Sequence, residues 1–239
     1  TDRTVYAVVS KVDAPIGDGA NDGTARNLKV VRSSDRGLSW TVGVQASSFT
    51  AERDVVTGLA VADNGYVLLM TVSAAGGGTG RVFLSTSRGE SFTQYGPVLA
   101  DVAANGPFAV APNFSATGRV AVGVDSGASP ATVSLYDQRS NTWGDLGFGL
   151  ASSGGTRIGI VAVAFSPDYA RDDVTYAVGL VGGVMRVRAK RGLGAPVDVV
   201  SLSNVYERGY IRFDRGGFLY FGGSRSSATT GDIERVDTR

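Results

Sequence analysis

The sequence predicts an all-β fold, a β-propeller of about five four-stranded antiparallel blades with repeats of about 50 residues. The first observation is a set of arginines that recur about every 50 residues, each after a short run with strand character: Arg36, Arg88, Arg139, Arg191 and Arg239. The second is that helix signals are nearly absent. A period near 50 residues made of short strands and turns is typical of propeller blades. We therefore interpret the chain as one domain, with blades at 1–50, 51–103, 104–155, 156–203 and 204–239.

The strands follow one order in each unit: strand a, polar turn, strand b, loop, strand c, Arg-Gly turn, strand d. Four segment pairs supply strands a and b: 58–65 with 66–70, 108–114 with 119–123, 163–169 with 174–178, and 210–217 with 218–221. Runs at 28–32, 81–85, 132–136, 184–188 and 233–236 supply strand c. Segment 48–57 has no sustained apolar stripe of helical period, so we expect a loop there.

The first and last blades are expected to be incomplete. Residues 4–8, Thr-Val-Tyr-Ala-Val, match residues 174–178, Val-Thr-Tyr-Ala-Val, so the first unit begins with strand b. The last unit stops at Arg239, where the other units turn into strand d. This pattern predicts a segment of a longer chain or assembly; a compact five-bladed ring with trimmed ends is the competing interpretation.

Composition excludes several functional classes. The 239 residues include no cysteine and no histidine, which excludes disulfides, thiolate or imidazole metal sites and catalysis by either side chain. The formal net charge of +1 gives no field that favours nucleic acid or an anionic membrane. No apolar run approaches the roughly 20 residues of a membrane span. We therefore expect no nucleic-acid partner and no direct membrane insertion.

Two copies of one motif follow strand c. Residues 33–40, Ser-Ser-Asp-Arg-Gly-Leu-Ser-Trp, fit the pattern S-x-D-x-G-x-x-W, and residues 85–92, Ser-Thr-Ser-Arg-Gly-Glu-Ser-Phe, are a degenerate copy. The defined positions are Ser33, Asp35, Gly37 and Trp40 in the first copy, and Ser85, Ser87, Gly89 and Phe92 in the second. Trp143 keeps only the final aromatic of a third copy.

This motif resembles the Asp box of the BNR-repeat β-propellers, which include sialidases and other members of a sialidase-like superfamily. The resemblance implies that the box lies at the c–d turn, opposite the usual binding face. A turn aspartate accepts backbone N–H groups, glycine supplies positive φ, and the aromatic packs between layers. We therefore interpret both copies as structural.

The ligand face of such a propeller is built from b–c and d–a loops near the axis. On this register, the face carries seven charged or aromatic candidates: Glu52, Arg53, Asp54, Arg157, Tyr206, Glu207 and Arg208. Tyr206 and Glu207 are adjacent, so on a strand they would point in opposite directions rather than form a nucleophile pair. Glycoside hydrolysis needs a pair of carboxylates, and no spacing or motif in the sequence identifies such a pair among these acidic residues.

One loop is rich in hard oxygen ligands. Segment 13–23 contains Asp13, Asp18, Asn21 and Asp22, residue types that suit Ca²⁺. The spacing fits no EF-hand, and turn-forming Asp and Asn explain the loop equally. We predict no cofactor, and we keep calcium as the alternative.

These patterns favour a non-enzymatic, exported propeller, extracellular or at the cell surface and bacterial, that serves as a scaffold or protein-interaction module in a surface layer, filament or larger complex. We expect protein partners or self-association. The alternative is a carbohydrate-active propeller, a glycoside hydrolase or lectin, whose glycan site is completed outside this chain.

Overall fold

The computed structural model describes residues 4–10, 28–45, 54–73, 78–103, 106–125, 130–151, 159–202, 204–206, 208–214, 217–224 and 231–236. These residues form five antiparallel sheets, which we call blades 1 to 5. The prediction of an all-β propeller with about five blades is confirmed.

The strands follow the chain order within each blade. Blade 1 contains β1 (Val5–Ser10), β2 (Leu28–Ser33) and β3 (Thr41–Gln45). Blade 2 contains β4 (Asp54–Val61), β5 (Val67–Ser73), β6 (Gly80–Ser85) and β7 (Thr93–Gln94). Blade 3 contains β8 (Phe108–Val110), β9 (Val120–Val124), β10 (Thr132–Asp137) and β11 (Thr142–Asp145). Blade 4 contains β12 (Ile160–Phe165), β13 (Val174–Val181), β14 (Val184–Arg191) and β15 (Val197–Ser201). Blade 5 contains β16 (Arg208–Phe213), β17 (Leu219–Ser224) and β18 (Gly231–Val236).

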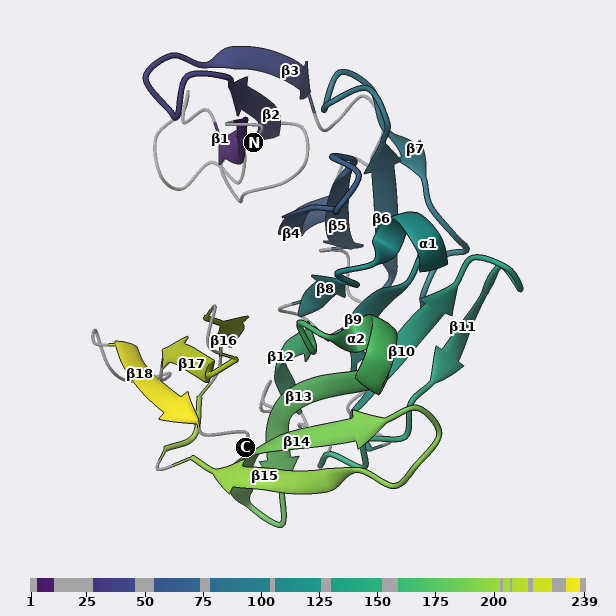
Figure 1. Cartoon of the computed structure of the whole chain (residues 1–239), viewed down its shortest axis with the longest axis vertical. Helices are drawn as coiled ribbons and strands as arrows, with labels where there is room; N and C mark the ends of the chain where they lie inside the picture. The colour runs from purple at the N-terminus through teal and green to yellow at the C-terminus, as the bar shows by residue number, and fades with distance from the viewer. Residues whose placement is uncertain are drawn as a thin grey trace.

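The blades are arranged along an open arc (Figure 1). Strands β4, β8, β12 and β16 line its inner side, and each lies beside the next. In blade 1 it is β1 that lies beside β4. Blades 1 and 5 form the two ends of the arc and border its opening (Figure 1).

The core is a series of apolar layers between consecutive blades. Strand β5 shows how one strand serves two layers: Val67 and Leu69 pack toward blade 1, whereas Leu68 and Met70 pack toward blade 3. All four side chains are buried, because both faces of this sheet are covered by neighbouring blades. A strand in such a sheet needs a continuous apolar run rather than an alternating one. The unbroken run of β12 has the same explanation.

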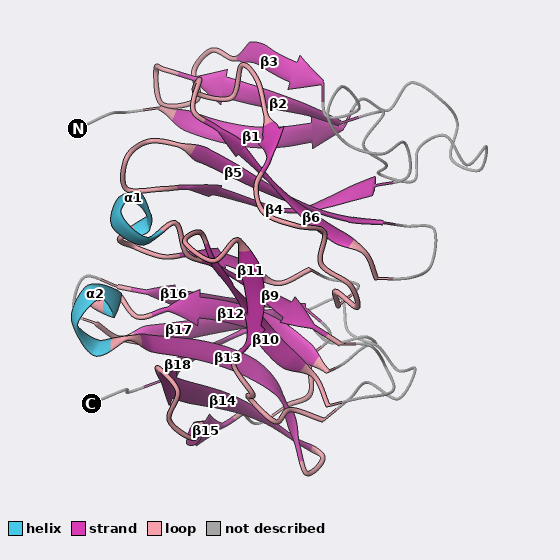
Figure 2. Cartoon of the chain, turned by 90° about the vertical axis from the view of Figure 1, so that its right-hand side faces the viewer, coloured by secondary structure: helices cyan, strands magenta, loops and turns pink. Residues whose placement is uncertain are grey.

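Two one-turn helices stand where the sequence predicted simple polar turns. Helices α1 (Phe114–Thr117) and α2 (Tyr169–Asp172) join strands a and b in blades 3 and 4, and they lie on the same side of the molecule (Figure 2). Phe114 and Tyr169 are buried, so each helix begins with an aromatic anchor in the core. Both helices end at a residue with positive φ, Gly118 and Asp173.

One further expectation was wrong. Residues 54–57, which we predicted as part of a loop, form the first half of β4. The run Asp-Val-Val-Thr is too short to show a period, and its pairing with β5 decides its conformation.

Candidate functional site

The turn between β2 and β3 is organised by Asp35. Its carboxylate accepts hydrogen bonds from the Ser39 N–H (2.8 Å), from Ser39 Oγ (2.5 Å) and from Ser33 Oγ (2.7 Å). Hydrogen bonds from the Ser39 side chain and backbone, and then from Ser33, lower the pKa of Asp35 from 3.8 to about 2. The Gly37 N–H donates to Ser33 Oγ at 2.7 Å. The Asp35 carboxylate therefore has a structural role: its hydrogen bonds to Ser33 and Ser39 hold the two sides of the turn together.

The turn between β6 and β7 keeps this pattern without a carboxylate. The Gly89 N–H donates to Ser85 Oγ at 2.8 Å, and the Ser91 N–H donates to Ser87 Oγ at 3.0 Å. The hydroxyls of Ser87 and Ser91 lie 2.9 Å apart. Ser87 thus replaces Asp35 as acceptor, and this explains how the degenerate copy folds in the same way.

Both turns also depart from the expected backbone. We assigned the positive φ to glycine, but the preceding arginine has it too: Arg36 has φ 64° and Arg88 has φ 56°, next to Gly37 at 92° and Gly89 at 84°. In each turn, two consecutive residues with positive φ thus lie inside a longer connection between the strands, 34–40 in blade 1 and 86–92 in blade 2. Arg36 and Arg88 therefore stand at a constrained turn position, and their side chains are exposed.

In blades 2 and 3, the aromatic near the start of the last strand packs toward the preceding blade. Phe92 of blade 2 is buried in the layer shared with blade 1. Trp143 of blade 3 packs against Tyr136 in the layer shared with blade 2, and its Nε1 donates to the Pro97 carbonyl at 2.9 Å. Among the described residues, no blade precedes blade 1, to which Trp40 belongs.

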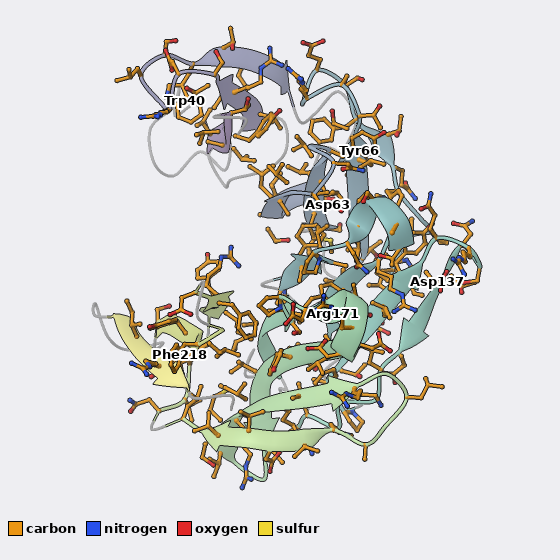
Figure 3. All side chains as sticks on the ribbon, viewed as in Figure 1. Trp40, Asp63, Tyr66, Asp137, Arg171 and Phe218 are labelled. Atoms are coloured by element: carbon orange, nitrogen blue, oxygen red, sulfur yellow. The ribbon has the colours of Figure 1, made fainter. Side chains whose placement is uncertain are left out.

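Trp40 is accordingly 44% exposed, and its Nε1 donates only within its own turn, to the Gly37 carbonyl at 3.0 Å. It lies on the end blade of the arc (Figure 3). Val42, Val5 and Val9 of the same blade are also exposed. In the sheet register Val42 opposes Val31, and Val31 opposes Ala7 between Val5 and Val9, so the three exposed valines share one face of blade 1. We call this face, with Trp40, the Trp40 face.

Blade 5 has a corresponding surface at the other end of the arc. Tyr210 and Ile233 oppose one another through Gly222 in the sheet register, and they are 70% and 81% exposed. The Arg235 guanidinium lies over the Phe218 ring at 4.1 Å, a cation–π arrangement. The opposite face of blade 5 holds Ile211 and Phe221, which are buried against blade 4.

A cavity of about 470 Å³ lies among the inner strands β4, β8, β12 and β16. Its lining is mostly backbone, glycine and apolar side chains, with Thr57, Tyr210 and Arg212 as the polar side chains. Arg212 donates to the Ile211 carbonyl at 3.0 Å. The cavity is therefore the axial space of the arc, shaped by strand backbones.

A second hollow, of about 300 Å³, lies beside the two helices. Arg119 crosses from blade 3 to blade 4 there and donates to Tyr169 Oη (2.8 Å) and to Asp173 Oδ1 (3.1 Å). Burial raises the pKa of Tyr169 to about 12, and Arg119 opposes that rise. Arg119, Tyr169 and Asp173 thus serve as hydrogen-bond partners for one another, and their contacts connect blade 3 to blade 4.

A similar bridge joins blades 2 and 3. Asp63 accepts from the Ser115 N–H at 2.8 Å and from Ser115 Oγ at 2.5 Å. Burial opposes ionisation, but these bonds outweigh it and lower the pKa of Asp63. Sequence reasoning missed both bridges, although a signal was present: the partners stand about one repeat apart, as do Arg119 and Tyr169.

Most of the predicted ligand-face residues lie outside the described residues: Glu52, Arg53, Arg157 and Glu207. Asp54 and Arg208 begin β4 and β16, and only their backbones are described. Tyr206 is described; its ring is fully buried and packs edge to face on Phe221, with centroids 4.9 Å apart. It is therefore held in the layer between blades 4 and 5.

The predicted calcium ligands, Asp13, Asp18, Asn21 and Asp22, also lie outside the described residues. Within the part of the chain that the structure describes, no group of three or more acidic residues is placed to hold a metal ion. Among the same residues, no helix has the length and apolar character needed to cross a membrane.

Comparison with solved structures places this arrangement in a known fold. A Hadza microbial sialidase aligns with a TM-score of 0.65 at 12% identity, over 98% of this chain and 49% of the sialidase chain. TolB from Acinetobacter baumannii aligns with a TM-score of 0.62 at 10% identity, over 90% of this chain and 47% of TolB. The fold is a β-propeller.

A Trypanosoma rangeli sialidase gives a TM-score of 0.58 at 12% identity, over 99% of this chain and 42% of the sialidase. This chain thus spans about half the length of these propellers or less. No protein-family model matches the sequence. No curated protein matches it either.

Proposed function

We propose that this chain is a non-enzymatic propeller module of the Asp-box type that acts as a scaffold, extracellular or at the cell surface, by binding other protein surfaces through the Trp40 face. The Asp-box assignment is supported by the shared hydrogen bonds of the two turns at Ser33–Trp40 and Ser85–Phe92.

The observation that carries the proposal is the exposure of Trp40 at a position whose counterparts are internal contacts. Phe92 holds the same place in its turn, directly before the last strand, whereas Trp143 is the second residue of β11 after a shorter turn; both pack toward a neighbouring blade. On the Trp40 face, the apolar side chains that could make such a contact are exposed to solvent: Trp40, Val42, Val5 and Val9. Exposed apolar side chains that share one face of a sheet are a feature of protein–protein contact sites. A large aromatic side chain is a typical anchor of an interface.

Site-specific photocrosslinking tests the proposal. A photoreactive amino acid at position 40, in the protein expressed in its source cells, is expected to give a discrete protein adduct. Position 193 is the matched control, because Leu193 is an apolar side chain that is 99% exposed but lies at a turn of blade 4.

Equal adducts at positions 40 and 193 would contradict the proposal, because they would reflect exposure alone. Hydrolysis of sialosides or β-glucans by the purified chain would contradict it in a different way, since the carbohydrate-active alternative would then be correct.

A further inference from the structure

The hollow beside helices α1 and α2 is bounded by segments that are far apart in the sequence. Helix α1 contributes Thr117 and its N-cap residue Asn113, the end of β10 and its turn contribute Asp137 and Arg139, and the end of α2 contributes its C-cap residue Asp173. The volume of about 300 Å³ is at the lower end of the range for pockets that hold small ligands. Blades 3 and 4 each have a neighbouring blade on both sides, so this hollow is not part of either end of the arc (Figure 1).

Three polar side chains of this hollow keep hydrogen-bonding capacity that the fold does not use. Arg139 is exposed, and its guanidinium has no partner among the described residues. The Arg139 backbone N–H donates to Asp137 Oδ1 at 2.8 Å, which leaves Asp137 Oδ2 as an acceptor without a partner in the same part of the chain. Asn113 makes no cap hydrogen bond with its side chain, and its Oδ1 accepts from Thr117 Oγ1 at 3.4 Å, so its side-chain N–H groups are available.

The charges around the hollow are balanced. Arg119 and Asp173 form an ion pair at 3.1 Å, and Arg139 and Asp137 carry opposite charges, so the formal charge of the lining is zero. An anionic ligand would approach Asp137, and a cationic ligand would approach Arg139. A guanidinium or amide N–H donates and a carboxylate accepts, whereas a hydroxyl group does both. A neutral ligand with several hydroxyl groups therefore matches the available groups best.

We propose that this hollow binds one neutral sugar unit of a glycan through hydrogen bonds with Arg139, Asp137 and Asn113. Neighbouring hydroxyl groups of a sugar ring accept from the guanidinium and the amide while they donate to the carboxylate. The site is separate from the Trp40 face and from the axial cavity. It goes beyond the proposed function because it assigns a ligand to the side of the molecule that carries α1 and α2 (Figure 2).

Arg139 differs from the arginines at the corresponding turns of blades 1 and 2. Arg36 and Arg88 are also exposed, but they line neither of the two hollows. Both have positive φ and precede a glycine, whereas φ of Arg139 is not positive and Ser140 follows it. The turn of blade 3 thus does not keep the motif, and its arginine lies in the wall of the hollow instead.

Titration with simple sugars, followed by NMR on the purified ¹⁵N-labelled chain, tests the proposal. The neutral probes are the methyl glycosides of glucose, galactose and mannose, and the charged probes are glucuronate and glucosamine. At least one neutral probe should give saturable shifts of the Asn113 side-chain amide and of the Arg139 backbone N–H. Glucuronate and glucosamine should bind about tenfold more weakly, because each brings a charge next to a like charge of the lining.

A pair of arginine variants separates a ligand contact from a general charge effect. Arg139→Ala removes an exposed side chain but keeps the N–H that donates to Asp137, so it should fold like the native chain and bind the neutral sugar at least about tenfold more weakly. Arg171→Ala is the matched control, because Arg171 is an exposed arginine of α2 that does not line the hollow (Figure 3). It should bind the sugar like the native chain.

Asp137→Asn tests the charge balance. Asparagine can still accept from the Arg139 N–H, but the free carboxylate oxygen becomes an amide donor and the formal charge of the lining becomes +1. This variant should therefore bind glucuronate more tightly than the neutral sugars, the reverse of the native order. A residue with a purely structural role would not reverse that order.

Four outcomes would overturn the inference. The first is the absence of saturable shifts with all three neutral sugars, and the second is equal weakening by Arg171→Ala. The third is tighter binding of glucuronate than of neutral sugars by the native chain, since the hollow would then be an anion site. The fourth is a set of shifts confined to Thr57 and Arg212, which would place the sugar in the axial cavity. Trp40→Ser should bind the sugar normally, so a failure of this site and a failure of the Trp40 face can be told apart.

Discussion

The turns of blades 1 and 2 share a hydrogen-bond pattern but differ in what their aromatic residue contacts. Ser33 and Ser85 accept from the glycine N–H in the same way, at 2.7 and 2.8 Å. Phe92 nevertheless is 8% exposed, whereas Trp40 is 44% exposed. The motif therefore fixes the direction of the aromatic, while the neighbouring blade decides how much that aromatic stabilises the fold.

The largest expected effect is that of Phe92→Ala. Removing this ring leaves a cavity in the layer between blades 1 and 2, so we expect a loss of about 3 kcal/mol in the free energy of unfolding. Urea denaturation followed by circular dichroism measures it. A loss below about 1 kcal/mol would mean that blade 1 does not depend on this contact.

The matched change Trp40→Ala should cost less than about 1 kcal/mol in the same chain, because a half-exposed ring buries little surface. Comparable losses of unfolding free energy for Trp40→Ala and Phe92→Ala would contradict the view that the neighbouring blade sets the contribution of the aromatic. If a partner covers the Trp40 face, the loss should increase toward that of Phe92→Ala when the partner is bound, measured as the shift in thermal midpoint.

The sequence predicted the repeat, the place of the turns and the class of fold, because these depend on local residue types such as Gly37 and Gly89 and on a period near 50 residues. It did not predict how Trp40 and Phe92 differ, since both fit the motif and only the presence of an adjacent blade separates them. It also missed helices α1 and α2, because one turn of helix is too short to show a period and is held by burial of Phe114 and Tyr169.

The candidate site was less predictable than the fold. Tyr206 was assigned to the ligand face from its place in a connection, yet its ring is fully buried on Phe221. The bridge from Asp63 to Ser115 depends on two turns that meet only in the folded state. The separation of Asp63 and Ser115 by about one repeat in the sequence could suggest that they meet, but it could not give the geometry of their hydrogen bonds.

A smaller effect should follow from restoring the full motif in blade 2. Ser87→Asp gives the Ser91 N–H a charged acceptor in place of a hydroxyl, so we expect a gain of roughly 0.5 kcal/mol at neutral pH. Urea denaturation at pH 7 checks the gain, with Thr86→Asp, which also adds a carboxylate to an exposed position of the turn, as the control. An equal gain for Thr86→Asp would indicate a general charge effect.

The finest distinction between the two turns is their response to acid. The pKa of Asp35 is lowered from 3.8 to about 2 by its hydrogen bonds from Ser39 and Ser33, so its stabilising effect is complete above about pH 4 and is lost as the pH falls through about 2. The Ser39 N–H should therefore shift in NMR spectra with a midpoint near pH 2, whereas the Ser91 N–H, which donates to the uncharged Ser87, should not titrate. In Asp35→Asn the Ser39 shift should become flat. A Ser39 midpoint near 3.8 in the native chain would show that the turn does not hold its carboxylate in solution, and the equivalence of the two turns would then depend on glycine and backbone geometry alone.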